Sequence, residues 1–390
     1  MLYFHKYIPL FCHSERNAES PACQGYLSSQ GILHRFTPPN DRLDQSEHLL
    51  GNCANLHCKG GKKMTHAVRI YETGGTEVLK WEPFDPGEPG PGEALVRHEA
   101  VGLNFIDVYH RTGLYPLPAL PWIPGMEGAG TVTAVGEGVT EVSVGQRVAY
   151  AGVPPGAYAQ VRTIPAHRLV ELPDEIAFEQ AAAMMLQGMT ARYLIRGCYQ
   201  VSTGDTILIH AAAGGVGTIV CQWAKHLGAT VIGTVGSPEK AELARANGCD
   251  HPVLYNSEDW VARTRDITNG KGVDVVYDSV GQATFDQSLD CLRPMGMLVT
   301  FGQSSGAIAP LDLGLLAAKG SLFVTRPSLM TYTAERDDLL VHAQDLFAVV
   351  QSGAVKIAVR QQYPLADIVR AHEDLEGRKT SGSSVLLPWG

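Results

Sequence analysis

Residues 206–234 read TILIHAAAGGVGTIVCQWAKHLGATVIGT, and this stretch decides the fold. The apolar run 206–210 has the length and composition of a strand buried in a parallel sheet. A glycine-rich turn follows at 211–217, then a helical pattern over 218–227 and a second strand over 230–234. In such a unit the N-terminus of the helix favours a bound phosphate group. The stretch therefore predicts a dinucleotide-binding unit.

The glycines of this turn have separate tasks. Gly214 lets the backbone approach the phosphates, and Gly217 lets the helix pack closely against the strand. Ala212 replaces the first glycine of the usual G-x-G-x-x-G pattern. Glycine turns often serve geometry alone, but the position between a strand and a helix favours nucleotide binding here.

The alternation of strands and helices continues down the chain. With the first two strands it predicts six strands, typical of an α/β doubly wound parallel sheet. Ligands on such sheets lie beyond the carboxyl ends of strands, the positions of 278–281 and 301–304. We expect helices over 238–247 and 258–268, another ending near Cys291, and strands near 252–255, 273–278, 297–301 and 321–325.

The end of the second strand indicates the cofactor. NAD-binding folds place an acid there to bind the ribose hydroxyls, whereas residues 233–237 contain no carboxylate. Ser237 and Lys240 offer a hydrogen bond and a charge to a 2′-phosphate. Lys240 taken alone could also be a solvated surface lysine, so the missing acid carries more of the prediction than the lysine does. We expect NADPH as the cofactor.

Composition limits the class of protein. A chain of 390 residues is expected to form about two domains, and its net charge of -9 argues against a nucleic-acid-binding face. The sequence contains no run of about 18 uncharged apolar residues, so we predict no membrane span. Cys198, Cys221, Cys249 and Cys291 lie singly in apolar or helical contexts, which indicates free thiols and a cytoplasmic location.

Residues 1–63 differ from the rest of the chain. They show no helical or alternating periodicity, and we expect a disordered or non-native extension. A metal site formed by His48, Cys53, His57 and Cys58 is disfavoured because the Cys-x4-Cys spacing is loose.

Residues 64–187 are rich in glycine, proline and valine, which predicts a compact β domain that begins with a strand near 67–71. From Met64 to Pro388 the chain resembles the medium-chain dehydrogenase/reductase superfamily, and within it the zinc-independent, zeta-crystallin-like NADPH:quinone oxidoreductase branch. The superfamily motifs lie at 92–97, 125–130, 145–148 and 211–217, and the branch motifs at 104–107, 277–281 and 325–328.

The resemblance implies a fold and its boundaries. A GroES-like catalytic domain is expected over 64–187, and a Rossmann NADPH-binding domain over 188–326. Residues 327–390 are expected to return to the catalytic domain.

The resemblance also implies that no metal is bound. Met126 stands where zinc-dependent relatives have a ligand histidine, and residues 104–107 occupy the region of their ligand cysteine. The cysteine-rich lobe of those relatives is absent from 150–158. A tetrahedral zinc site is therefore not expected. Without a Lewis acid, an electron-poor acceptor such as a quinone or an enone is favoured.

Cofactor roles follow from the same resemblance. It implies Asn104 near the nicotinamide ribose, Tyr193, Gly215 and Val216 at the pyrophosphate, and Ser279 beside the adenosine. Gly214 and Gly217 join the cofactor-binding residues through their tasks in the glycine turn. It implies Ser237, Lys240, Tyr255 and Arg378 around the adenosine phosphate, and Phe301, Gly302, Gln303, Ser304, Pro327, Ser328 and Leu329 by the nicotinamide.

The candidates for substrate contact are Asn104, Asp107 and Tyr115. Asn104 lies in an apolar run, where a buried amide demands partners, while Tyr115 could also be a simple turn aromatic. His110 and His167 are weaker candidates for a proton donor, because water can protonate the product of a quinone.

These observations predict an NADPH-dependent quinone reductase that works by hydride transfer. An alkenal or enone double-bond reductase is the alternative with the same fold. A crystallin-like structural or RNA-binding protein is the alternative of another class, disfavoured by the intact glycine turn and the acidic charge. The apolar terminal strand 321–325 is expected to be covered by a second copy in a homodimer.

Overall fold

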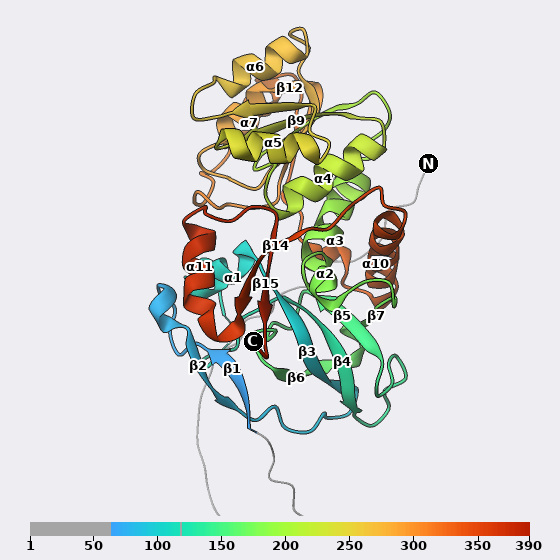
Figure 1. Ribbon diagram of the computed structural model, residues 1–390. Coiled ribbons are helices and arrows are strands. Elements are labelled where there is room, and N and C mark those ends of the chain that lie inside the picture. Colours follow the sequence, from blue (N-terminus) through green and yellow to red (C-terminus); the bar gives the residue numbers. More distant parts are fainter. Residues whose placement is uncertain (1–63, 118) are drawn as a thin grey trace, which may run out of the picture. The chain divides into compact units, whose positions relative to one another are not determined.

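The computed structural model describes residues 64–117 and 119–390. The extension predicted at 1–63 and its disfavoured metal ligands lie outside the described residues. Figure 1 shows a mainly antiparallel sheet formed by both ends of the described chain, and a parallel sheet formed by its middle. No helix among the described residues is long and apolar enough to cross a membrane.

The parallel sheet has six strands in the order β10-β9-β8-β11-β12-β13. The chain adds strands outward from β8 in one direction, then returns and adds them in the other. This reversal at β8 and β11 is the doubly wound arrangement, so the predicted α/β class is confirmed. The strands are β8 (Thr206–Ile209), β9 (Thr230–Val235), β10 (His251–Leu254), β11 (Val273–Asp278), β12 (Leu292–Thr300) and β13 (Phe323–Thr325).

The helices of this unit start at capping residues. Ser237 caps α5 by accepting a hydrogen bond from the Lys240 backbone, with proline in the first turn, and Asp259 caps α6. The helix predicted over 218–227 begins three residues earlier, because Gly214 has the extended backbone of an N-cap. The helices are α4 (Gly215–His226), α5 (Pro238–Ala246), α6 (Trp260–Ile267), α7 (Phe285–Asp290) and α8 (Leu313–Ala318).

The second large sheet has seven strands in the order β14-β15-β3-β4-β5-β7, with β6 paired to β3, and β1 and β2 form a separate ribbon. Because β15 pairs antiparallel with β3, the C-terminal segment returns to this sheet. The strands are β1 (Thr65–Arg69), β2 (Lys80–Phe84), β3 (Glu93–Leu103), β4 (Glu127–Val135), β5 (Arg147–Ala151), β6 (Val161–Pro165), β7 (Val170–Glu171), β14 (Val359–Pro364) and β15 (Ser383–Leu387).

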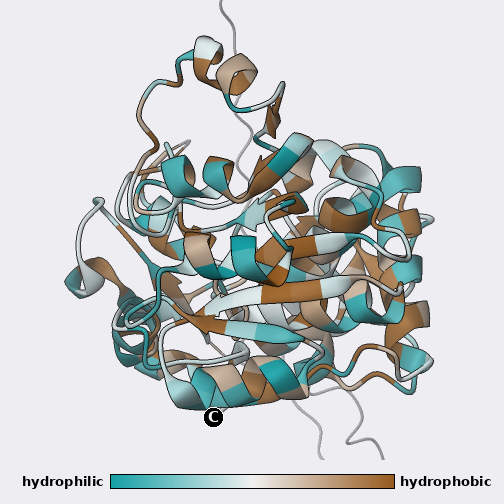
Figure 2. Ribbon diagram, turned by 90° about the horizontal axis from the view of Figure 1, so that it is seen from above, coloured by the Kyte–Doolittle hydropathy of each residue, from teal (hydrophilic) through white to brown (hydrophobic). Residues whose placement is uncertain are grey.

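The remaining helices and turns lie before β8 or after β13 in the chain. The expected boundary between residues 187 and 188 falls inside α3, which packs against α4 and α10. Figure 2 shows apolar residues along strands and inner helix faces, with hydrophilic residues on many outer turns. These elements are α1 (Phe105–Arg111), α2 (Phe178–Ala182), α3 (Met185–Tyr193), α9 (Leu329–Tyr332), α10 (Arg336–Gln351) and α11 (Ile368–Glu376), the single turns η1 (Thr76–Val78), η2 (Ala166–Arg168) and η4 (Leu365–Asp367), and the π-turn η3 (Leu194–Cys198).

The departure at Ala212 is accommodated by the neighbouring strand. A Cβ added to Gly233 in β9 would lie 2.5 Å from the Ala212 Cβ and 2.7 Å from the Cys249 Sγ. The glycine on β9 therefore provides the space that the alanine methyl group occupies. Ala211, not Ala212, adopts the left-handed backbone of the turn, with φ of 53°.

We expect Gly233→Ala to lower the free energy of unfolding by about 1–3 kcal/mol, because the added methyl group overpacks this contact. Ala212→Gly in the same chain should recover part of the loss. Gly90→Ala is the control, because its added Cβ would meet only the flexible end of Glu93, at 3.2 Å. Urea denaturation measures all of these values; equal stability of the Gly233 and Gly90 variants would contradict the explanation.

Candidate active site

A cavity of about 1030 Å3 lies beyond the carboxyl ends of the parallel strands. Residues that follow β8, β9, β11, β12 and β13 line it, together with residues of α1 and of the chain after α11. This is the place where open α/β sheets bind ligands. Its size exceeds that of a pocket for one small molecule, so it has room for an extended cofactor with an acceptor beside it.

The glycine turn presents bare backbone to this cavity. A Cβ on Gly215 would lie 2.1 Å from the Gln187 Oε1, and a Cβ on Gly217 would lie 2.3 Å from the Ala211 carbonyl oxygen. No side chain fits at either position. The twelve-residue helix α4 starts at this turn, so its free N–H groups and its dipole suit a pyrophosphate.

The C-terminal segment closes against the same turn. The backbone N–H of Gly382 donates to the Ala213 carbonyl oxygen over 2.9 Å, and Gly382 forms a bridge with Gly214. Arg378 precedes this contact and lines the cavity. The tail thus contributes a cation to the site.

Lys240 and Arg378 form the cationic end of the cavity. The Lys240 Nζ donates to the Arg378 carbonyl oxygen over 3.0 Å, and Tyr255 lines the cavity with them. Burial, and then the charge of Arg378, lower the pKa of Lys240. Two cations and no acid at the tip of β9 suit a phosphate group.

Asn104 is held in one orientation at the start of α1. Its Nδ2 donates to the Glu127 Oε2 over 2.7 Å, and its Oδ1 accepts a hydrogen bond from the Gln187 Nε2 over 3.0 Å. The side chain is buried yet borders the cavity. The partners that a buried amide demands are therefore present.

Comparison with known proteins decides the family. Residues 90–174 match the family model of the alcohol dehydrogenase GroES-like domain, and residues 215–336 match that of zinc-binding dehydrogenases. A Pseudomonas aeruginosa quinone oxidoreductase is 50% identical over 325 residues, which cover 83% of this chain and 100% of the relative. The chain belongs to the quinone oxidoreductase branch of the medium-chain dehydrogenase/reductase superfamily.

Two further relatives extend the comparison. The crystal structure of the Escherichia coli quinone oxidoreductase in complex with NADPH has a TM-score of 0.81 and 49% identity, covering 83% of this chain and 100% of that one. A 2-haloacrylate reductase from Burkholderia is 45% identical over 335 residues, which cover 83% of this chain and 99% of that protein.

Two carboxyl groups are buried beneath the site of this quinone oxidoreductase family member. The Glu127 Oε1 accepts from the Leu186 N–H over 2.8 Å; the Asp107 Oδ2 accepts from the Tyr158 hydroxyl and the Asn104 N–H, both over 2.9 Å. Burial raises the pKa of Glu127 to about 8 and that of Asp107 to about 7. Each carboxyl therefore gains or loses its proton near neutral pH.

Arg326 and Tyr115 meet at the cavity wall. The Arg326 Nη2 donates to the Tyr115 hydroxyl over 3.0 Å, and its Nη1 donates to the Gly302 carbonyl oxygen over 2.7 Å. The Tyr109 ring lies 5.1 Å from the Tyr115 ring. Tyr115 is therefore part of a packed aromatic wall, not an isolated turn residue.

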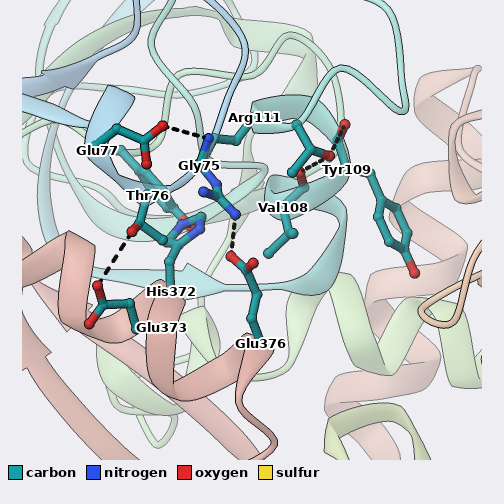
Figure 3. Close-up of polar contacts among 11 residues, drawn as sticks. Gly75, Thr76, Glu77, Val108, Tyr109, Arg111, His372, Glu373 and Glu376 are labelled. Carbon is teal, nitrogen blue, oxygen red and sulfur yellow. Dashed lines mark hydrogen bonds and ion pairs between the residues drawn. The ribbon is translucent and has the colours of Figure 1, made fainter.

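Figure 3 shows how helix α11 is tied to α1. The buried Arg111 side chain forms an ion pair with Glu376, at the end of α11. On another turn of α11, the Glu373 Oε1 accepts a hydrogen bond from the Thr76 hydroxyl over 3.4 Å. Because the chain runs from Glu376 directly into the segment with Arg378, these contacts hold that segment near the glycine turn.

The structure gathers most of the predicted residues at one cavity. Asp107, Ser237 and Gln303 do not line it: Asp107 is fully buried under Asn104, the Ser237 hydroxyl caps α5, and the Gln303 N–H donates to the Tyr109 hydroxyl. His110 lines the cavity and His167 does not. The lining includes Asn104, Tyr115, Tyr193, Gly214, Gly215, Val216, Gly217, Lys240, Tyr255, Ser279, Phe301, Gly302, Ser304, Pro327, Ser328, Leu329 and Arg378.

Sequence reasoning missed four residues of the site. Glu127 lies in the glycine-rich segment 125–130, where a carboxylate among apolar residues was the available signal. Arg326 precedes the predicted Pro327, and Gln187 is the last residue of the expected catalytic domain, but only their long-range hydrogen bonds show their importance. His210 also borders the cavity, with its ring nitrogens bonded to the hydroxyls of Thr234 and Ser288.

The part of the chain that the structure describes contains no cluster of potential metal ligands. No three histidine, cysteine, aspartate or glutamate side chains gather there in a way that could hold an ion. Cys198, Cys221, Cys249 and Cys291 are free thiols.

The raised pKa of Glu127 has a consequence for stability. Folding raises this pKa from 4.5 to about 8, so the folded protein holds the proton more tightly than the unfolded chain. The stability from this group is complete below about pH 4.5 and is lost as the pH rises through about 8. We therefore expect wild-type protein to lose stability relative to Glu127→Gln as the pH rises through this range.

Urea denaturation of both proteins between pH 5 and 9 measures that difference. The exposed Glu137→Gln variant is the control, and its difference from wild type should stay level. A difference that stays constant for Glu127→Gln, or that moves in favour of wild type at high pH, would show that the buried carboxyl is already ionised.

Proposed function

We propose that this protein is an NADPH-dependent quinone reductase. The observation that carries this proposal is one cavity that contains the glycine turn at α4 and the cations Lys240 and Arg378. The tip of β9, where NAD-binding folds have an acid, has none. The quinone oxidoreductases from Pseudomonas aeruginosa and Escherichia coli support this proposal, since the sequence match to the first and the structural match to the second each cover 100% of that protein.

The residues fit the cofactor along the whole cavity. The bare backbone at Gly215 and Gly217 would receive the pyrophosphate, and Lys240 with Arg378 would bind the 2′-phosphate. Asn104 would bind the nicotinamide ribose with the Nδ2 hydrogen that Glu127 does not use. The remaining lining residues named above keep the cofactor roles that the resemblance implies.

Bound NADPH supplies a hydride, and the protein supplies placement. Glu127 and Gln187 fix the amide of Asn104 from opposite sides, so the ribose has one binding geometry. Tyr109 and Tyr115 offer an aromatic wall to a flat acceptor. We propose that Asp107 positions Asn104 through its backbone and does not contact the substrate, because its carboxyl is fully buried outside the lining.

We further propose that the reaction needs no zinc. The side chain of Met126 is buried at the position where the resemblance places a ligand histidine in zinc-dependent relatives, and a thioether is a poor ligand for zinc. Metal analysis of active protein tests this point: a stoichiometric zinc ion whose removal abolishes turnover would overturn it.

Reduction of alkenals and enones is the second candidate function. It is supported by the 2-haloacrylate reductase from Burkholderia, whose name describes reduction of a conjugated double bond. Steady-state turnover of a benzoquinone, a naphthoquinone and an alkenal, followed by NADPH oxidation at about 340 nm, distinguishes the two. Faster turnover of the quinones is expected; turnover of the alkenal alone would favour the second candidate.

We expect Lys240→Ala to weaken NADPH binding about 10- to 100-fold and NADH binding little, because one charged hydrogen bond to the 2′-phosphate is lost. Fluorescence titration of both cofactors measures the two dissociation constants. Lys271→Ala is the control, an exposed lysine that does not line the cavity. Equal losses for NADPH and NADH would refute the assignment of the phosphate site.

We also propose a cytoplasmic homodimer. β13 is the terminal strand of the parallel sheet, and the Phe323 side chain on it is 57% exposed. A second copy that pairs at this strand would cover both the open edge and the ring.

Light scattering is expected to give twice the chain mass for wild type and about one chain mass for Phe323→Lys, because a charge on the edge opposes pairing. Val341→Lys, at an exposed apolar residue on α10, should remain dimeric. A wild-type monomer at micromolar concentration would end the proposal.

A further inference from the structure

The charges around the cavity leave one cation without a counter-charge. Among the described lining residues, the permanent cations are Lys240, Arg326 and Arg378, and the only carboxylate is that of Glu376. Glu376 is already paired with Arg111. Lys240 and Arg378 lie together where the proposed 2′-phosphate would neutralise them. Arg326 remains.

Arg326 is fixed by neutral groups. Its Nη1 donates to the carbonyl oxygens of Thr300 and Gly302 and to the Thr300 hydroxyl, and its Nη2 donates to the Tyr115 hydroxyl. No carboxylate of the described residues lies within ion-pair distance of it. A guanidinium has five N–H donors, so its Nε hydrogen and one Nη2 hydrogen stay available.

Tyr115 adds a second donor next to these hydrogens. Its hydroxyl oxygen accepts the bond from the Arg326 Nη2 over 3.0 Å, which leaves the hydroxyl hydrogen free to donate. Two groups that both donate and stand one hydrogen bond apart suit an oxygen with a negative charge. The neighbouring ring of Tyr109 suits the flat conjugated system that would carry such an oxygen.

We propose that Arg326 is the specificity-determining residue of this site, and that it selects conjugated acceptors with an anionic oxygen, such as hydroxyquinones or α,β-unsaturated carboxylates. The proposal rests on the proposed function, since it names the acceptors that the NADPH-dependent reductase would prefer. Arg326 binds the anionic oxygen, while the apolar and aromatic lining receives the ring or double bond.

The same contact would assist the reaction. When the acceptor takes a hydride, a C–H bond forms at one end of its conjugated system, and the displaced π electron pair moves to the conjugated oxygen. The hydride would leave C4 of the nicotinamide with both electrons of the broken C–H bond, which converts NADPH to NADP+. Water then supplies one proton to the reduced acceptor. The conjugated oxygen is more negative in the transition state than in the ground state, so a fixed guanidinium stabilises the transition state more than the ground state.

Two naphthoquinones that differ in charge test the proposal. 2-Hydroxy-1,4-naphthoquinone is an anion at neutral pH, and 2-methyl-1,4-naphthoquinone is neutral. We expect Arg326→Gln to lower kcat/KM at least about tenfold for the anion and less than about threefold for the neutral quinone. Arg326→Lys should recover part of the preference, because it keeps the charge but loses the planar fork.

Three controls exclude other roles for Arg326. The KM for NADPH should stay within about twofold of wild type, since a larger change would show that Arg326 serves the cofactor instead. Tyr115→Phe removes the hydroxyl but keeps the guanidinium, so the preference for the anion should persist. Arg196→Gln removes an exposed arginine that does not line the cavity, and neither quinone should be affected.

A binding measurement separates this proposal from the proposed function. Benzoate and benzamide have the same shape and differ in charge, and neither is reduced. Benzoate should bind the wild-type NADPH complex at least about tenfold more tightly than benzamide, by NADPH fluorescence, and Arg326→Gln should abolish the difference. If Arg326→Gln does not fold, Arg326→Lys carries the comparison and should narrow the difference.

The possible outcomes are distinct. Equal loss of both quinones in Arg326→Gln, or equal binding of benzoate and benzamide to wild type, overturns the proposal. If wild type binds NADPH but reduces neither quinone, the proposed function fails, and the benzoate comparison still decides whether Arg326 binds anions.

Discussion

The side chain of Gln187 holds the two halves of the site together. Its Nε2 donates to Asn104 at the start of α1, and its Oε1 accepts from the Ser383 hydroxyl on β15, so one amide joins the first sheet, the tail and α3. The same oxygen lies 2.1 Å from the position that a Cβ on Gly215 would take, so α3 packs directly against the glycine turn. A buried amide with both ends satisfied has one orientation, since turning it over would place the Gln187 Oε1 against the Asn104 Oδ1, acceptor against acceptor. Gln187 is therefore the residue that links Asn104 directly to the glycine turn.

The acidic and the basic side chains of this site lie at different depths. The cations Lys240, Arg326 and Arg378 border the cavity, where a ligand can neutralise them. Glu127 and Asp107 lie beneath its floor, where burial disfavours their ionised forms and raises both pKa values towards neutrality. The floor can therefore be rich in hydrogen-bond acceptors without placing much negative charge next to an anionic cofactor. The carboxyls orient Asn104, and the charge that the ligand meets is mainly positive.

The sequence predicts best what is determined locally. The unit 206–234 forms as expected because strand, turn and helix follow each other within one stretch, and their apolar periodicity is set by neighbours. Ala212 breaks the usual pattern, and its compensation by Gly233 comes from the next strand, which no short motif reveals. The missed bonds join residues far apart: 83 residues separate Asn104 from Gln187, and 211 separate Tyr115 from Arg326. Hydrophobic patterning does not encode such pairs, because each partner alone is an ordinary polar residue.

The cationic end of the site depends on the correct folding of the C-terminal segment. Arg378 lies in the left-handed region, with φ of 57°, and the backbone reaches the glycine turn four residues later at Gly382. That path is fixed at one end by β15, which pairs with β3, and at the other by the buried Arg111, which holds Glu376. A cation on a free chain would spend little time near the turn, since ordering each residue costs about 1–2 kcal/mol in backbone entropy. The pairing of β15 with β3 and the ion pair of Arg111 with Glu376 offset this entropy cost during folding. Lys240 and Arg378 therefore already lie together before a phosphate binds.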